Sequence, residues 1–261
     1  MTHEKPCEEL SDAQNYYLQA ANLLKGMKHN DNAELAVKYL TKSADLGLVE
    51  AQYQMGVMYS LGEHVAKSQP IAFDWFKKAS DCDFIPAQFA MATLYSQSDQ
   101  FGKAFDILNG LANKEITEAQ TNLADLYLRG KGVDKDVVKA ISLLKCAANK
   151  GDRFAQYRLG QLYYQGQDTA TDYVSARKYI VLAMEQKVLQ AYFIMGSMLE
   201  HGFGIDKDVV RAYSLYSYCR HYGMPNLDDL IEDVLGTLDD IKKQQAKQKA
   251  QEYCEHEPSP I

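Results

Sequence analysis

An Ala-Gln pair followed by an apolar ladder recurs along this chain of 261 residues, and this repeat constrains the fold more than any other feature. Successive anchor alanines are separated by 38, 36, 32, 36 and 36 residues, although the last unit lacks the Gln. A period of this length is typical of helical repeat proteins, whose units bury their apolar faces only by stacking on their neighbours. The anchors are Ala13, Ala51, Ala87, Ala119, Ala155 and Ala191.

Each unit predicts a pair of helices. Apolar residues at the anchor and at four and seven positions beyond it form one stripe on the first helix. The position five beyond the anchor is Gly or Ala in the last five units, which predicts close approach of a neighbouring helix. A second helix is expected to follow, capped four residues before its own anchor alanine. Those cap positions hold Asn32, Ser68, Gln100, Asp136, Asp172 and Asp208, of which all but Gln100 are favoured cap types.

Two regions depart from the pattern. The third unit lacks the Gly-bearing loop and is four residues shorter, so we expect a tight turn near residues 96–100. After Pro225 the repeat gives way to an apolar stripe running from Leu227 to Ile241, with Asn226 as a candidate N-cap. The predicted organisation is an N-terminal extension (1–10), a repeat region (11–224), one C-terminal capping helix (225–253) and a flexible tail (254–261).

Composition narrows the classes of partner. The net charge of −7 weighs against general binding to nucleic acid, because an acidic chain gains little from releasing phosphate counterions. No stretch has the ~20 consecutive apolar residues of a membrane span. The first ten residues are polar and lack the apolar core of a secretion signal. The chain has five cysteines, an odd number, and no CxxC pair. We therefore expect reduced thiols and a cytoplasmic location.

The segment from Ala119 to Gly151 carries a recognisable motif. Gly130, Gly132 and Val133 form its loop, Asp136, Lys139 and Ala140 start its second helix, and Ala147, Ala148 and Gly151 close it. In these residues the chain resembles the Sel-one-like repeat family, a relative of the tetratricopeptide repeat. The resemblance covers roughly residues 11–224. It implies an all-α, right-handed α-solenoid of about six helix-turn-helix repeats with a C-terminal capping helix, acting as a protein-binding adaptor.

Motifs for catalysis or metal binding are absent from the sequence. There is no HExxH, Walker loop or GxSxG elbow, and Asp134 to Asp136 lacks the remaining ligands of a calcium loop. Cys219 and His221 are two apart on a predicted helix, so they point in different directions, and Cys219 fits core packing. We expect no enzyme activity, no metal and no cofactor.

The candidate binding surface is the face of the first helices opposite the main apolar stripe. In solenoids of this kind the first helices typically line the concave side, which suits an extended peptide or a partner helix. Four of the six anchors are followed two positions later by an aromatic residue. These aromatic residues either contribute to that surface or pack between adjacent first helices, and both roles can hold. The candidates are Tyr53, Val57, Phe89, Thr93, Asp125, Tyr157, Gln161, Phe193 and Ser197.

The leading hypothesis is therefore a non-enzymatic scaffold that binds a protein or peptide through this concave face, in an unknown oligomeric state. One alternative is a member that binds or hydrolyses β-lactams, because a cysteine-rich branch of the family has been linked to β-lactam binding. This chain lacks the cysteine pair which that branch carries in each repeat. The other alternative is an envelope or host-interaction protein of a bacterial pathogen.

Overall fold

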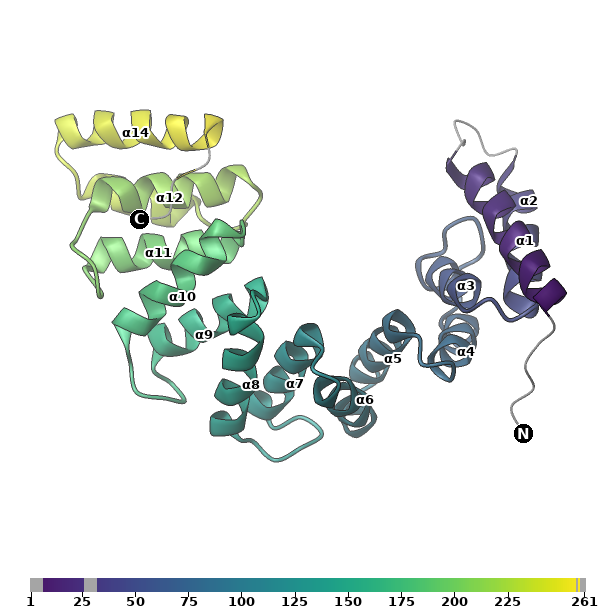
Figure 1. Cartoon of the computed structure of the whole chain (residues 1–261). Coiled ribbons are helices and arrows are strands. Elements are labelled where there is room, and N and C mark those ends of the chain that lie inside the picture. Colours follow the sequence, from purple (N-terminus) through teal and green to yellow (C-terminus); the bar gives the residue numbers. More distant parts are fainter. Residues whose placement is uncertain (1–6, 26–31, 257, 259–261) are drawn as a thin grey trace. The chain divides into compact units, whose positions relative to one another are not determined.

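The computed structural model describes residues 7–25, 32–256 and 258. Over these residues the chain forms fourteen α-helices and no strand, which confirms the all-α prediction. The helices fall into two compact units, and Figure 1 shows their order along the chain. The N-terminal unit contains the first six helices together with residues 131–133, and the C-terminal unit contains the other eight.

The N-terminal unit consists of three helix pairs. Each helix packs against the one that follows it in the chain. The pairs are α1 (Cys7–Lys25) with α2 (Ala33–Asp45), α3 (Val49–Leu61) with α4 (Gln69–Ser80), and α5 (Ile85–Gln97) with α6 (Phe101–Asn113). Helix α1 includes part of the predicted extension 1–10, of which residues 1–6 lie outside the described residues.

The C-terminal unit contains three further pairs and two closing helices. The pairs are α7 (Thr117–Arg129) with α8 (Val137–Asn149), α9 (Arg153–Gln165) with α10 (Tyr173–Glu185), and α11 (Leu189–His201) with α12 (Val209–His221). The closing helices are α13 (Asp228–Gly236) and α14 (Asp240–Glu255). Among all the helices that the structure describes, none is long and apolar enough to cross a membrane.

The anchor alanines predicted from the repeat form the centre of the packing. Every one of them is at most 1% exposed. At these positions two helix backbones lie against each other, and a side chain larger than a methyl group would not fit between them. The first-helix anchors are Ala13, Ala51, Ala87, Ala119, Ala155 and Ala191, and the second-helix anchors are Ala36, Ala72, Ala104, Ala140, Ala176 and Ala212.

The small residues predicted to admit a neighbouring helix also have that role. A Cβ added to Gly56 would lie 2.5 Å from the Phe76 ring, and one added to Gly196 would lie 2.8 Å from the Tyr216 ring. Glycine costs a helix about 0.5–1 kcal/mol relative to alanine, so these positions trade helix propensity for contact with a buried aromatic ring.

Helix ends follow the sequence signals only in part. The second helices α8, α10 and α12 are each capped by an aspartate side chain, as predicted. Asn32 and Ser68 occupy the predicted N-cap positions, but the predicted side-chain caps are wrong there, because neither side chain bonds a helix amide. Asn32 has a helical rather than an extended backbone, which does not suit a side-chain cap. The tight turn predicted in the third unit is present, with Asp99 in the left-handed region.

The single capping helix predicted over 225–253 is two helices. Helix α13 ends at Gly236, a poor helix former, and Asp239 starts α14 by accepting a bond from the amide of Lys242. Asn226 has a φ of 59°, so it is not the N-cap; Leu227 occupies that place. Ile241, expected in the apolar stripe, is 72% exposed. Residues 257 and 259–261 of the predicted tail lie outside the described residues.

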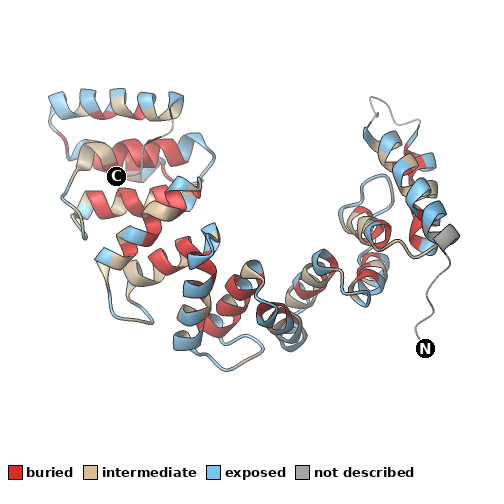
Figure 2. Cartoon of the chain, viewed as in Figure 1, coloured by how far each residue is buried: buried red, intermediate tan, exposed pale blue. Residues whose placement is uncertain are grey.

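Helices α11, α13 and α14 all pack against α12. Residues from Ala212 to Cys219 are consequently all buried, and Figure 2 shows this run in red along α12. The Ser214 hydroxyl donates to the carbonyl of Ala246 in α14 at 3.3 Å. The prediction that Cys219 packs in the core is confirmed, since its side chain is fully buried.

Candidate binding groove

The predicted concave-face residues lie on first helices of both units. Tyr53 and Val57 are on α3, and Phe89 and Thr93 are on α5, in the N-terminal unit. The C-terminal unit holds the other five on α7, α9 and α11: Asp125, Tyr157, Gln161, Phe193 and Ser197.

In the N-terminal unit the aromatic at position 53 is engaged in packing. The Tyr53 ring lies 5.7 Å from Phe76 of α4 and 5.5 Å from Phe84, which precedes α5. Phe193 behaves in the same way in the C-terminal unit, 5.3 Å from Tyr216 of α12. Both rings therefore reach the second helix of their own repeat, and neither forms part of a column of free aromatic side chains.

A groove lies between α7 and α9 in the C-terminal unit. Its volume is about 660 Å³. Two predicted residues, Asp125 and Tyr157, line it, together with residues that the sequence analysis did not select. Its lining is Thr117, Glu118, Thr121, Asn122, Asp125, Asp152, Arg153, Phe154, Tyr157 and Arg158.

Arg158 joins the two helices across this groove. Its Nε donates to Asp125 Oδ1 at 2.9 Å, its second terminal nitrogen also donates to that oxygen, and its first donates to Gln161 Oε1 at 2.8 Å. The Arg158 and Asp125 side chains are 26% and 33% exposed, so solvent screens the pair only in part. Arg158 thus brings together two predicted residues, Asp125 and Gln161.

The end of the groove near Asp152 is held by hydrogen bonds. Asp152 caps α9 by accepting from the amide of Ala155 at 2.7 Å. Thr121, the residue two beyond its anchor, places its hydroxyl 3.2 Å from the same carboxylate oxygen. Burial raises the pKa of the Tyr157 phenol, and the nearby Arg158 charge offsets this only in part. Tyr157 is therefore a neutral hydrogen-bonding group at physiological pH.

Phe154 gives the groove an exposed aromatic wall. Its side chain is 52% exposed, and the Arg153 guanidinium lies 4.8 Å from the ring centroid. Aromatic residues and arginine are the types that contribute most to protein interfaces. The repeat pattern did not reveal Phe154 because it precedes the anchor Ala155 by one residue, where no stripe is expected.

Ser197 is engaged on the next first helix. Its hydroxyl lies 2.7 Å from the phenol oxygen of Tyr164, which ties α11 to α9. Elsewhere in the described chain, no group of three His, Cys, Asp or Glu side chains is placed to hold a metal ion. Burial raises the pKa of the Cys219 thiol to about 12, which keeps it protonated and unsuited to act as a nucleophile.

Comparison with protein families identifies the repeat. A model of the Sel1 repeat matches residues 24–48, 49–84, 117–152, 153–187 and 189–218. These ranges leave out residues 85–116, the irregular third unit. No curated protein sequence matches the chain.

Solved structures show the same fold. A Sel1 repeat protein from Oxalobacter formigenes is 22% identical with a TM-score of 0.70, over 93% of this chain and 99% of that one. A protective antigen of uropathogenic Escherichia coli strains, described as an SLR fold, is 21% identical with a TM-score of 0.58. That match covers 95% of this chain, which spans 62% of the antigen's length.

An immunity protein of Pseudomonas aeruginosa is also similar, at 22% identity and a TM-score of 0.51 over 79% of this chain and 81% of that one. At these identities the likeness concerns the fold alone. The family follows from the repeats themselves, which occupy more than half of the residues: the chain belongs to the Sel1 repeat family.

Proposed function

We propose that this protein is a non-enzymatic scaffold that binds a segment of a partner protein in the groove between α7 and α9. The observation that carries the proposal is Phe154, a large apolar side chain that lines the groove beside Arg153 and is 52% exposed. A partner that covers this ring removes apolar surface from water, a transfer that favours the complex by about 25 cal/mol per Å² before the entropic cost of association is subtracted.

The polar residues of the groove support a role in orienting a partner. Arg158 and Asp125 already satisfy one another, so a bound segment need not neutralise a charge there. The Tyr157 phenol and the Asn122 amide are left to form directional hydrogen bonds with a peptide backbone. Groups of this kind, around an aromatic anchor, give specificity in protein recognition.

The cytoplasmic location is part of the proposal. Cys82, Cys146, Cys219 and Cys254 are free thiols. Free thiols are typical of a reducing compartment.

A crosslinking experiment tests the groove. A photo-reactive amino acid is placed at position 154 and, as a matched control, at position 138, where Val138 of α8 is 82% exposed outside the groove. In cells that express the full chain, we expect position 154 to crosslink a defined partner that position 138 does not reach. Tyr157→Ala in the same background is expected to weaken that crosslink. Identical crosslinked species from both positions would contradict the groove assignment.

A further inference from the structure

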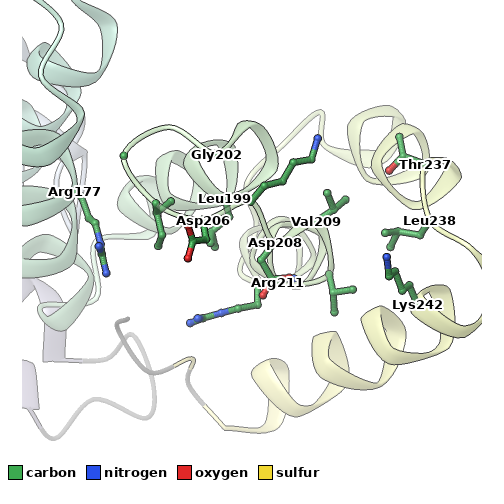
Figure 3. A pocket seen from close by; sticks show the side chains of 14 residues that line it. Arg177, Leu199, Gly202, Asp206, Asp208, Val209, Arg211, Thr237, Leu238 and Lys242 are labelled. Atoms are coloured by element: carbon green, nitrogen blue, oxygen red, sulfur yellow. The ribbon is translucent and has the colours of Figure 1, made fainter.

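A second and larger pocket lies near the C-terminal end of the repeat array, about 1240 Å³ in volume (Figure 3). It lies wholly within the C-terminal unit. One side is formed by α12 and the loop that precedes it, from Gly202 to Asp208. The other sides come from Arg177 of α10, the connection at Thr237 and Leu238, and Lys242 of α14. We call it the basic pocket.

Cations from three different helices line the basic pocket. In Figure 3, Arg211 extends from α12 toward the side where Arg177 projects from α10, while Lys242 enters from α14. Lys207 also lines it. These cations are concentrated in one place although the whole chain has a net charge of −7. A local excess of positive charge in an acidic protein attracts anionic groups.

The acidic residues of the pocket do not neutralise the two arginines. Asp208 is used as the N-cap of α12, where it accepts from the amide of Arg211 at 2.9 Å. Asp206 also lines the pocket. Within the part of the chain that the structure describes, no ion pair joins either carboxylate to Arg177 or Arg211. Lys242 lies 3.9 Å from Asp239, a contact exposed to solvent.

One donor of the Arg211 side chain lacks a partner in the described part of the chain. Its Nε is buried and has no hydrogen-bond partner among the described residues. It lies in the first turn of α12, where the helix dipole disfavours a positive charge. A buried donor without a partner destabilises the folded protein, whereas a ligand that accepts from it would remove that cost.

Arg211 lacks an aromatic contact that the equivalent cation of another repeat makes. The equivalent cation of the fourth repeat, Lys139, lies 4.6 Å from the ring of Tyr127, a residue of its own repeat. In the last repeat the position of Tyr127 is taken by Leu199, which lines the basic pocket. The aromatic partner of the cation is therefore missing, and its place opens onto the cavity.

We propose that the basic pocket binds an acidic peptide segment, with an Asp or Glu carboxylate of the segment held by Arg177 and Arg211. A carboxylate is planar and accepts hydrogen bonds from guanidinium groups in a two-pronged geometry. The pocket is much larger than a single small anion, and Leu199, Ile205 and Leu238 supply apolar wall for neighbouring side chains. The inference rests on the proposed function in one respect, that the partner is a protein.

The test uses the full-length protein and an array of random heptapeptides with amidated C-termini, so that side chains supply all the carboxylates. Peptides that bind the wild type are expected to be enriched in Asp or Glu. Exchange of that residue for Asn or Gln should weaken binding by about ten-fold or more, the loss typical of a charged hydrogen bond. Arg177→Gln and Arg211→Gln should each cause a loss of similar size, measured by fluorescence anisotropy.

Lys178→Gln is the matched control, because Lys178 neighbours Arg177 on α10 but is exposed and outside the pocket. It removes the same charge and should leave binding unchanged. Circular dichroism melting of each variant verifies that it is folded. No acidic enrichment, or an equal loss with Lys178→Gln, would overturn the proposal. Inorganic phosphate titrated alone tests a free anion, and affinity equal to that of the peptides would also overturn it.

A Phe154→Ala variant separates this proposal from the groove. If the selected peptides lose affinity only in Phe154→Ala, the basic pocket assignment fails while the proposed scaffold function stands. If they lose affinity only in the arginine variants, the pocket assignment holds and the groove needs another role. If no heptapeptide binds the wild type, both assignments fail.

Discussion

The second helices of the two units begin at the same position of the repeat, yet they begin by different means. In the C-terminal unit, α8, α10 and α12 each start with an aspartate whose carboxylate accepts from a backbone amide three residues on. In the N-terminal unit, α2, α4 and α6 start without any side-chain cap. The same topology therefore has side-chain caps at these helix starts in one unit and none in the other.

Gly196→Ala should cause the largest change. The added Cβ would lie 2.8 Å from the ring of Tyr216, which is 1% exposed and held by its hydroxyl bond to Glu200, so the ring has no room to move. We expect a loss of about 1–3 kcal/mol, the usual cost of overpacking a core. Urea unfolding followed by circular dichroism measures it. An unchanged midpoint would show that α11 and α12 are packed more loosely than their contacts indicate.

Replacing the N-cap residue of a second helix should have different effects on stability in the two units. Asp136→Ala deletes the bond to the amide of Lys139 and should destabilise α8 by about 1 kcal/mol. Ser68→Ala, at the equivalent position of α4, deletes no such bond and should stay within about 0.5 kcal/mol of the wild type. Hydrogen exchange with mass spectrometry reports on each helix separately. Equal loss of protection in α4 and α8 would show that the side-chain cap makes no difference between the two units.

Gly110→Ala should have the opposite sign to Gly196→Ala. Gly110 lies inside α6 of the N-terminal unit, and a Cβ added there would meet nothing within 4 Å. Alanine should therefore stabilise the helix by about 0.5–1 kcal/mol through propensity alone. The same urea titration serves as the measurement. A destabilised variant would mean that the position contacts something absent from the described packing.

The smallest effect concerns pH. Hydrogen bonds from Ser175 hold the pKa of Asp172 below the ordinary value of an aspartate. A lowered folded-state pKa means that the stabilisation is present above the unfolded-state pKa and is lost as pH falls through the folded-state pKa. Protection of the first amides of α10 should thus decline in acid below about pH 4. Asp172→Asn should abolish that dependence; a decline that persists in the variant would point to another group.

The anchor alanines could be predicted from sequence periodicity. The two helices that pack together are adjacent in the chain, so the residues at their contact recur once in every repeat. Periodicity predicted the end of the array less well. The apolar stripe after Pro225 continues in register across Gly236, so the break between α13 and α14 depends on local turn geometry at Thr237 and Leu238, which periodicity does not report.

The groove was predicted only in part for a similar reason. Asp125 was selected, but its partner Arg158 lies 33 residues later, at a different position of the next repeat. The sequence does contain a signal for this pair. An acidic residue, Asp125, lies six positions after one anchor alanine, and a basic residue, Arg158, lies three positions after the next anchor alanine. Recognising it requires the stagger between neighbouring first helices, which follows from packing.

The buried anchor alanines have a consequence for how such chains diverge. Twelve methyl groups, each at most 1% exposed, fix the distances between helix axes. The outer faces of the second helices carry residues such as Val138 and Val174, which are 82% and 77% exposed and free of any packing demand. Substitutions can therefore accumulate over most of the surface while the spacing of the array is kept. Identity counted over whole chains then understates how alike two such proteins are, and a few small residues at fixed intervals are the better measure of descent.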